Sequence, residues 1–275
     1  MNYIKELDIK DIVAAALKED IGTRDITTEA FIPPDKSVKA IILAKENFVV
    51  CGLGVAALAF RLQDKDIKFK ACVREGQFVK KGKRLAKLSG NARGILTAER
   101  VALNFLSLLS GISTKTRKFV NAVKPHKVKI LDTRKTIPGL RLLEKYAVRI
   151  GGGFNHRFCL DEMVLVKDNH LKIVGGIDRL GGFSRKQRTE IEVKDLREFK
   201  TALLLDPDII MLDNMSVKEM KRAAAARASR KPRLEASGGI TLKNIKKIAA
   251  SGVDMISVGE LTDSLNSVDL SLEIL

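Results

Sequence analysis

The stretch Met163-Val-Leu-Val-Lys-Asp-Asn-His170 shows the pattern that decides the fold, a short apolar run followed at once by charged and polar residues. The same pattern recurs at Ile209-Ile-Met-Leu-Asp-Asn214 and at Met255-Ile-Ser-Val-Gly-Glu260. Short apolar runs that end in polar or glycine residues are typical of buried strands. Helical spacing lies between several of them, at 196–205, 217–225 and 242–251. This alternation predicts βαβ units and a parallel sheet.

The ends of these apolar runs carry the residue types that a binding site needs. Val128–Leu131 leads into Asp-Thr-Arg-Lys, Ile191–Val193 into Lys-Asp, and Leu234 into Glu-Ala-Ser-Gly-Gly. Charged residues at the carboxyl ends of successive parallel strands favour a barrel with its site at that face. An open doubly wound sheet would use the same strand ends and is the alternative.

The first third of the chain has a mixed pattern. Helical spacing is present at Tyr3–Lys18 and, over a longer stretch, from Thr97 to Val123. Residues Asp20 to Thr28 indicate an irregular loop, and the glycines within Glu75–Gly90 indicate hairpin turns. Strands are predicted between these segments, at 38–44, 48–51 and 67–73.

Composition limits the class of protein. The chain has 275 residues, 45% of them apolar, which allows a sizeable core in one large or two modest domains. No run approaches the ~20 apolar residues of a membrane span, and the N-terminus lacks the apolar segment of a signal peptide. Cys51, Cys72 and Cys159 are widely spaced, which predicts buried or partly buried free thiols in a reducing cytoplasm.

The charge balance favours anionic partners. Fifty Lys and Arg against 33 Asp and Glu give a net charge of +17, spread along the chain. The absence of Trp and the presence of only two Tyr provide little for base stacking. Phosphorylated small molecules are therefore favoured over nucleic acid or a membrane surface.

Glycines follow the last two predicted strands, in Ser237-Gly-Gly-Ile240 and Val258-Gly-Glu260. In barrels, the loops after the last two strands commonly bind a phosphate, and small residues let backbone N–H groups approach the anion. A helix starting near Thr241 would point its positive end there. The two glycines alone would also fit a plain turn.

Cationic residues follow three other strand ends. Thr133, Arg134 and Lys135 follow one strand, His156 and Arg157 follow three glycines, and Lys167 ends a further strand. Together they suit a substrate with several negative charges, because Arg pairs with carboxylates and Lys suits phosphate. Each alone could be a surface charge, and His156 could be a structural donor to the backbone.

Two carboxylates, Glu192 and Asp213, end adjacent predicted strands. They could hold ribose hydroxyls, bind hydrated Mg²⁺, face a cationic transition state, or serve as counter-ions to the cations. Glu190 alternates with Glu192 and should point the same way in support of the site. No nucleophile elbow, Walker loop or complete dinucleotide fingerprint occurs in the sequence.

Taken together, these segments resemble the quinolinate phosphoribosyltransferase family. The segments that carry the resemblance, in chain order, are Thr97–Leu106, Ser110–Thr114, Leu131–Arg141, Gly151-Gly-Gly-Phe-Asn-His-Arg157, Val166–His170, Glu190–Val193, Met211–Asn214 and Glu235–Ile240. The resemblance implies transfer of phosphoribose from phosphoribosyl pyrophosphate to quinolinate, with magnesium. The products would be nicotinate mononucleotide, carbon dioxide and pyrophosphate.

The resemblance also implies an architecture. We expect an α/β fold with an N-terminal α/β sandwich domain over 1–110 and a C-terminal open α/β, TIM-like barrel over 111–263. The tail 264–275 is expected to pack back on the first domain. The family works as homodimers or assemblies of dimers, in which Arg100 of the partner subunit would enter the site.

Carried over to this sequence, the resemblance assigns each site residue. Quinolinate would be held by Arg134, His156, Arg157 and Lys167 with the partner's Arg100, and Thr133 is placed among the substrate-binding residues. Lys135, Glu192 and Asp213 would hold phosphoribosyl pyrophosphate and Mg²⁺, the metal through water. The 5′-phosphate would be surrounded by Ser237, Gly238, Gly239, Val258, Gly259 and Glu260. The predicted catalytic residues are Lys135, Lys167, Glu192 and Asp213.

One segment departs from the family pattern. Relatives commonly read Gly-Ala-Leu-Thr-His-Ser where this chain has Gly259-Glu-Leu-Thr-Asp-Ser264, so Glu260 puts a carboxylate near the proposed phosphate. The alternatives are a pyrophosphorylase-like paralogue associated with molybdate transport, a basic nucleic-acid-binding module and an inactive paralogue. The intact Lys167–His170 element and the retained Arg134, Lys135, Glu192 and Asp213 favour the enzyme.

Overall fold

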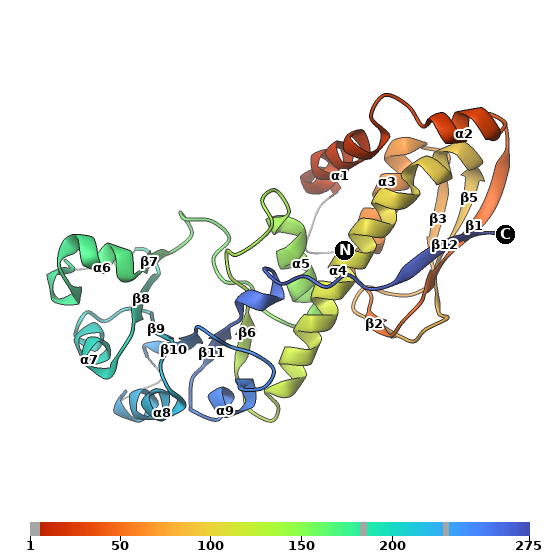
Figure 1. Cartoon of the computed structure of the whole chain (residues 1–275). Helices are drawn as coiled ribbons and strands as arrows, with labels where there is room; N and C mark the ends of the chain where they lie inside the picture. Colours follow the sequence, from red (N-terminus) through yellow and green to blue (C-terminus); the bar gives the residue numbers. More distant parts are fainter. Residues whose placement is uncertain (1–5, 182–185, 228–230) are drawn as a thin grey trace. The chain divides into compact units, whose positions relative to one another are not determined.

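The computed structural model describes residues 6–181, 186–227 and 231–275, which form two compact units (Figure 1). The first unit comprises residues up to Arg117 together with Thr136–Gly152 and Ser264–Leu275, and the second comprises Lys118–Lys135 and Gly153–Asp263. The predicted boundaries differ from these at residues 111–117 and 136–152, both of which were placed in the barrel domain. The two segments contact each other, since the Ser113 hydroxyl donates to the carbonyl of Ala147 at 2.7 Å.

The first unit is built on a four-stranded antiparallel sheet in the order β12-β1-β5-β3. Its strands are β1 (Ser37–Ala44), β3 (Lys68–Ala71), β5 (Arg84–Asn91) and β12 (Leu270–Ile274). β12 lies beside β1, with Ile42 opposite Leu272, so the end of the chain completes the sheet of the first unit. A separate antiparallel pair is formed by β2 (Phe48–Val49) and β4 (Phe78–Val79).

Helices cover this sheet. α1 (Glu6–Ile21) contacts α3 (Leu53–Gln63), and α3 contacts β3. The start of α3 is satisfied by the half-buried carboxylate of Glu75, which accepts from the backbone N–H groups of Gly52 and Leu53. A carboxylate is favourable there because the first N–H groups of a helix have no partner within it. Residues 3–5 of the helix predicted at Tyr3–Lys18 lie outside the described residues.

The long helix α4 (Ala92–Ala122) begins five residues before the predicted Thr97. By length and composition it is the one described helix that could cross a membrane, but 61% of its most apolar window is buried inside the protein. Such burial is typical of the core helix of a globular domain. Ile95, Leu106 and Leu109 are fully buried members of this face.

The second unit contains a six-stranded, wholly parallel sheet in the order β6-β11-β10-β9-β8-β7. The strands are β6 (Lys129–Leu131), β7 (Val164–Val166), β8 (Thr189–Val193), β9 (Ile209–Asp213), β10 (Arg233–Ser237) and β11 (Met255–Ser257). Their apolar residues make a buried core, with Ile191, Ile210 and Leu234 fully enclosed. The predicted α/β architecture and parallel sheet are confirmed; curvature of the sheet into an open barrel stays a prediction.

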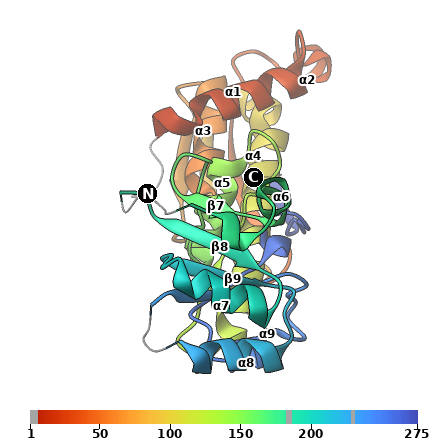
Figure 2. The same ribbon diagram turned by 90° about the vertical axis from the view of Figure 1, so that its left-hand side faces the viewer.

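Four α-helices of this unit connect strands of the sheet, and the last three of them lie side by side (Figures 1 and 2). They are α6 (Asp168–Val174), α7 (Leu196–Leu204), α8 (Val217–Ala226) and α9 (Ile245–Ala249). Capping side chains begin two of these helices. At the start of α7, Asp195 accepts from the N–H groups of Arg197 and Glu198, and at the start of α8, Ser216 and Glu219 form a capping box. These caps fix where each strand-to-helix loop ends.

Three local expectations were wrong. The predicted loop from Asp20 to Thr28 contains the start of α2 (Ile26–Phe31), because Asp25 accepts from the Thr28 N–H and caps that helix. The helix expected near Thr241 begins only at Ile245, since Asn244 accepts from the Thr241 N–H and holds a turn. All three cysteines are free, but Cys72 is exposed on the edge strand side of the first sheet.

Candidate active site

The carboxyl ends of the six parallel strands open into one cavity of about 800 Å³ in the second unit. Its walls come from the loops after all six strands, as the sequence pattern predicts for a parallel sheet. The predicted site residues that line it are Thr133, Arg134, Lys135, His156, Arg157, Lys167, Glu192, Asp213, Ser237, Gly238, Gly239, Gly259 and Glu260. Two predicted residues are elsewhere: the Val258 side chain is fully buried, and Arg100 belongs to the first unit.

The cationic wall begins after β6. The hydroxyl of Thr133 accepts from the backbone N–H of Lys135, which shapes the turn, and the Thr262 hydroxyl donates to the carbonyl of Lys135. Lys135 itself is exposed in the cavity mouth. The Nε of Arg134 is buried and has no hydrogen-bond partner among the described residues. A buried guanidinium donor without a partner suits an anionic ligand at this position.

Arg157 lies in the loop between α5 (Arg141–Gly151) and β7. Its Nη1 donates to the carbonyl of Met163 at 3.1 Å, which orients the guanidinium along the cavity wall. Burial, and next the positive charge of Arg134, lower the pKa of Arg157, while Glu190 raises it. Both arginines remain charged, so the guanidinium groups of Arg134 and Arg157 repel each other and favour the binding of carboxylates.

The same loop is tied to β6. Asp132, fully buried, accepts from the backbone N–H of His156 at 2.9 Å and from the side-chain amide of Asn155 at 2.5 Å. The loop is therefore anchored at both its backbone and a side chain. Asp132 directly precedes the cationic cluster, but its buried position was not visible in the sequence.

Lys167 and Glu192 form the central ion pair of the site. Lys167 Nζ lies 2.7 Å from Glu192 Oε2, and the Glu192 side chain is 12% exposed. The backbone N–H of Lys167 donates to Nδ1 of His170, so His170 supports the start of α6 rather than facing the cavity.

Asp213 lies opposite the glycine turn after β10. The sheet register pairs Asp213 with Ser237, and the amide of Asn214 donates to Asp213 Oδ2 at 2.8 Å. Gly238 has φ +86°, and a Cβ at this position would lie 2.3 Å from Asn214 Oδ1. The backbone of the turn is thus packed closely against Asn214, which leaves no room for a side chain.

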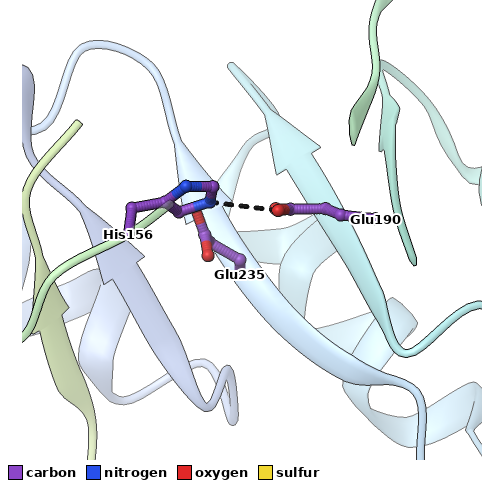
Figure 3. A group of neighbouring side chains, drawn as sticks. All are labelled: His156, Glu190 and Glu235. Atoms are coloured by element: carbon purple, nitrogen blue, oxygen red, sulfur yellow. Dashed lines mark ion pairs between the residues drawn. The ribbon is translucent and has the colours of Figure 1, made fainter. Parts of the chain in front are cut away.

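In the cavity wall, Nε2 of His156 faces two fully buried carboxylates (Figure 3). Its Nε2 is 3.0 Å from Glu190 Oε2 and 3.5 Å from Glu235 Oε1. Burial, and next the charge of Glu190, raise the pKa of Glu235 to about 8, while His156 lowers it. Glu235 therefore carries a proton at neutral pH. The Ser257 hydroxyl also donates to Glu235.

Sequence reasoning did not single out Glu235 or Asn214. One signal for Glu235 was available in the sequence. Side chains two residues apart in a strand lie on the same face, so Glu235 shares the face of Ser237, which was predicted to line the site. Glu190, predicted to support the site, lies against His156.

Known proteins are similar to this chain over most of its length. The sequence matches "Quinolinate phosphoribosyl transferase, N-terminal domain" over residues 25–110 and the corresponding C-terminal domain over residues 112–273. The chain belongs to the quinolinate phosphoribosyltransferase family. Both domain descriptions together cover most of the sequence.

Individual relatives of the quinolinate phosphoribosyltransferase family are similar over nearly their whole length. A probable nicotinate-nucleotide pyrophosphorylase (carboxylating) of Synechocystis is 42% identical and covers 94% of this chain and 90% of its own. The chloroplastic enzyme of that name from Arabidopsis thaliana is 40% identical over 97% of this chain and 83% of its own. The structure of the nicotinate-nucleotide pyrophosphorylase from Francisella tularensis superposes with a TM-score of 0.93 at 40% identity, covering 100% and 98% of the two chains.

Proposed function

We infer that this protein transfers the phosphoribosyl group of phosphoribosyl pyrophosphate to quinolinate and decarboxylates the product, giving nicotinate mononucleotide for NAD biosynthesis. The family assignment supports the reaction. The observation that carries this reaction onto the present chain is the cavity at the strand ends. Three cations, Arg134, Arg157 and Lys167, line this cavity together with the carboxylates of Glu192 and Asp213. Such a cavity suits a dicarboxylate and a sugar phosphate together.

Quinolinate recognition falls to the cationic side. Arg134 offers its buried, unpaired Nε, and Arg157 offers the part of its guanidinium that does not bond Met163. Lys167 adds a point charge beside Glu192. Two guanidinium groups and an ammonium match two carboxylates on neighbouring ring carbons, whereas nicotinate would leave part of this charge unmatched.

Phosphoribosyl pyrophosphate recognition falls to the other side. Lys135 in the cavity mouth suits the pyrophosphate, and the backbone of Gly238 and Gly239 suits the 5′-phosphate, since positive-φ turns can present N–H groups to an anion. The support is the turn alone, because α9 begins five residues after Ile240 and is too short to contribute.

Mg²⁺ fits the residues present. Glu192 and Asp213 come from adjacent strands and line the same cavity, and carboxylate oxygens are the ligands that Mg²⁺ prefers. When bound there, through water, the metal would neutralise charge on the pyrophosphate leaving group. The carboxylates would also hold the ribose hydroxyls.

The chemistry follows from these placements. The pyridine nitrogen attacks C1 of the ribose while the bond from C1 to pyrophosphate breaks, and the carboxylates of Glu192 and Asp213 stabilise the positive charge that develops on the sugar. The ring nitrogen is then cationic and accepts the electron pair from the bond to the C2 carboxylate. Carbon dioxide leaves and C2 takes up a proton. No side chain is required as a dedicated base for that loss.

The assembly and compartment belong to the same proposal. We propose a cytoplasmic homodimer or assembly of dimers, in which Arg100 of the partner subunit adds a further cation for quinolinate. Support comes from the family resemblance and from the three free thiols, which suit a reducing compartment. We propose no nucleic-acid or membrane partner.

A product assay tests the function. The purified protein is incubated with phosphoribosyl pyrophosphate, Mg²⁺ and either quinolinate or nicotinate, and nicotinate mononucleotide is followed by chromatography. Product is expected from quinolinate only, and chelation of the metal should abolish it. Equal product from nicotinate would contradict the dicarboxylate role of the Arg and Lys cluster. Absence of product from both, with folded protein, would favour the paralogue.

A further inference from the structure

His156 is placed among the side chains that bind quinolinate by family resemblance, but its ring is already engaged within the protein. Its Nδ1 accepts from the backbone N–H of Arg157 at 2.9 Å. An accepting Nδ1 places the ring proton on Nε2, and Nε2 faces Glu190 and Glu235 (Figure 3). Nδ1 therefore carries no proton that it could donate to a substrate carboxylate, and Nε2 lies beside two buried carboxylates.

The two carboxylates have no access to solvent. Glu190 and Glu235 are both 0% exposed, and they come from strands separated by β9. Neither oxygen of Glu190 has a hydrogen-bond partner among the described residues, and Nε2 of His156 lies 3.0 Å from Oε2 of Glu190. Buried carboxylates are costly unless a partner compensates them, so their retention here calls for a role.

The residue that this arrangement fixes is Arg157. Oε2 of Glu190 lies 3.0 Å from Nε2 of the His156 ring, and Nδ1 of the same ring accepts from the Arg157 backbone N–H at 2.9 Å. The His156 backbone is held separately by Asp132. The loop segment is therefore clamped on both sides, and the Arg157 guanidinium leaves it toward the cavity.

We propose that Glu190 and Glu235 are positioning residues for quinolinate recognition: they hold the His156 ring, and the ring holds the Arg157 backbone so that its guanidinium meets a substrate carboxylate. This proposal rests on the proposed function. It predicts that the two carboxylates act on quinolinate binding only, although neither reaches the cavity.

The test measures KM for each substrate in Glu235→Gln and Glu190→Gln. We expect KM for quinolinate to rise about tenfold in each, which is within the usual cost of disturbing a buried polar contact, with KM for phosphoribosyl pyrophosphate within about twofold of its starting value. Glu75→Gln is the control, because Glu75 is a half-buried carboxylate in the other unit that accepts from backbone N–H groups, and it should leave both KM values unchanged.

A double-mutant cycle with Arg157→Lys separates positioning from general weakening. If the carboxylates act through Arg157, adding Glu235→Gln to Arg157→Lys should raise KM for quinolinate little further. Two substitutions at His156 divide its contacts: His156→Asn can still accept from Arg157, and His156→Gln can still donate to Glu190. We expect the Asn variant to keep the lower KM for quinolinate.

Several results would overturn the proposal. Multiplicative effects in the cycle, equal increases in both KM values, or unchanged KM in both Gln variants would each do so. So would one equivalent of tightly bound transition metal in the purified protein that Glu235→Gln loses, since the three side chains would then be metal ligands. If the unmodified protein forms no product, the proposed function fails first, and the two failures are distinguished.

Discussion

Single residues at the strand ends account for most of the specificity that this site can have. Lys167 pairs with Glu192 at 2.7 Å, and this pair lies where the cationic and acidic sides of the cavity meet. The sequence predicted both residues at the carboxyl ends of strands: Lys167 directly follows β7, and Glu192 is the penultimate residue of β8. It could not show that they touch.

Replacing Lys167 tests the cationic side. Lys167→Met should lower kcat/KM for quinolinate about 100-fold, because a charge in a cavity of this kind is worth far more than one on the surface. Steady-state kinetics measure the effect. Lys172→Met is the control, since Lys172 is exposed on α6 and pairs only with surface groups; comparable losses in both variants would refute the assignment.

Gly238 tests the turn after β10. Gly238→Ala should raise KM for phosphoribosyl pyrophosphate and cost roughly 1–3 kcal/mol of stability, because a Cβ would collide with Asn214 at a positive φ. Gly82→Ala provides the comparison: φ is +83° there, but a Cβ would meet no atom within 4 Å. An unchanged KM in Gly238→Ala would show that the turn does not hold the phosphate. A larger stability loss in Gly82→Ala would contradict the collision between a Cβ at position 238 and Asn214.

At the scale of elements, the alternating pattern predicted all six parallel strands and the helices between the later ones. Errors arose where a side chain decides a boundary: Asp25 starts α2 inside a predicted loop, and Asn244 delays α9. The role of Glu235 was also missed, because strand spacing shows which face a residue takes but not which partner it meets there. The spacing of apolar residues predicts where strands and helices lie. The partner of a buried side chain depends on residues that are distant in the sequence.

The loop after β11 carries the departure from the family pattern. Glu260 lines the cavity together with Asp263, so its carboxylate repels a bound phosphate. Glu260→Ala should lower KM for phosphoribosyl pyrophosphate about fivefold at low ionic strength, and less at high salt, where exposed charges are screened. Glu29→Ala removes the same charge on the first unit and should change nothing. An increase in KM for Glu260→Ala would indicate that this carboxylate assists binding.

For the whole molecule, the chain divides into two units. The parallel sheet and all the predicted site residues except Arg100 lie in the second unit. The chain's last strand returns to β1, while the segment 136–152 crosses from the predicted barrel domain to the first unit. The family resemblance placed the domain boundary after residue 110. The structure shows that packing, not chain order, decides which unit a segment joins.

Stability should depend on pH through Glu235. Its pKa is raised from 4.5 to about 8 in the folded protein, so between these values the folded state holds a proton that the unfolded state has lost. Stability from this group is therefore full below about pH 4.5 and falls as pH rises toward 8. Urea unfolding midpoints at pH 5.5 and 7.5 should differ less in Glu235→Gln than in the unmodified protein. An equal or larger difference would contradict the raised pKa.

The most direct test of the central claim, that this cavity joins quinolinate to phosphoribose and removes its C2 carboxylate, uses quinolinate labelled with ¹³C in that carboxylate. The reaction is run with phosphoribosyl pyrophosphate and Mg²⁺, and both the released gas and the nucleotide are analysed by mass spectrometry. The account predicts that all consumed label appears as ¹³CO₂ and that the nucleotide is unlabelled nicotinate mononucleotide. A nucleotide that retains the label, or pyrophosphate release without nucleotide, would contradict it.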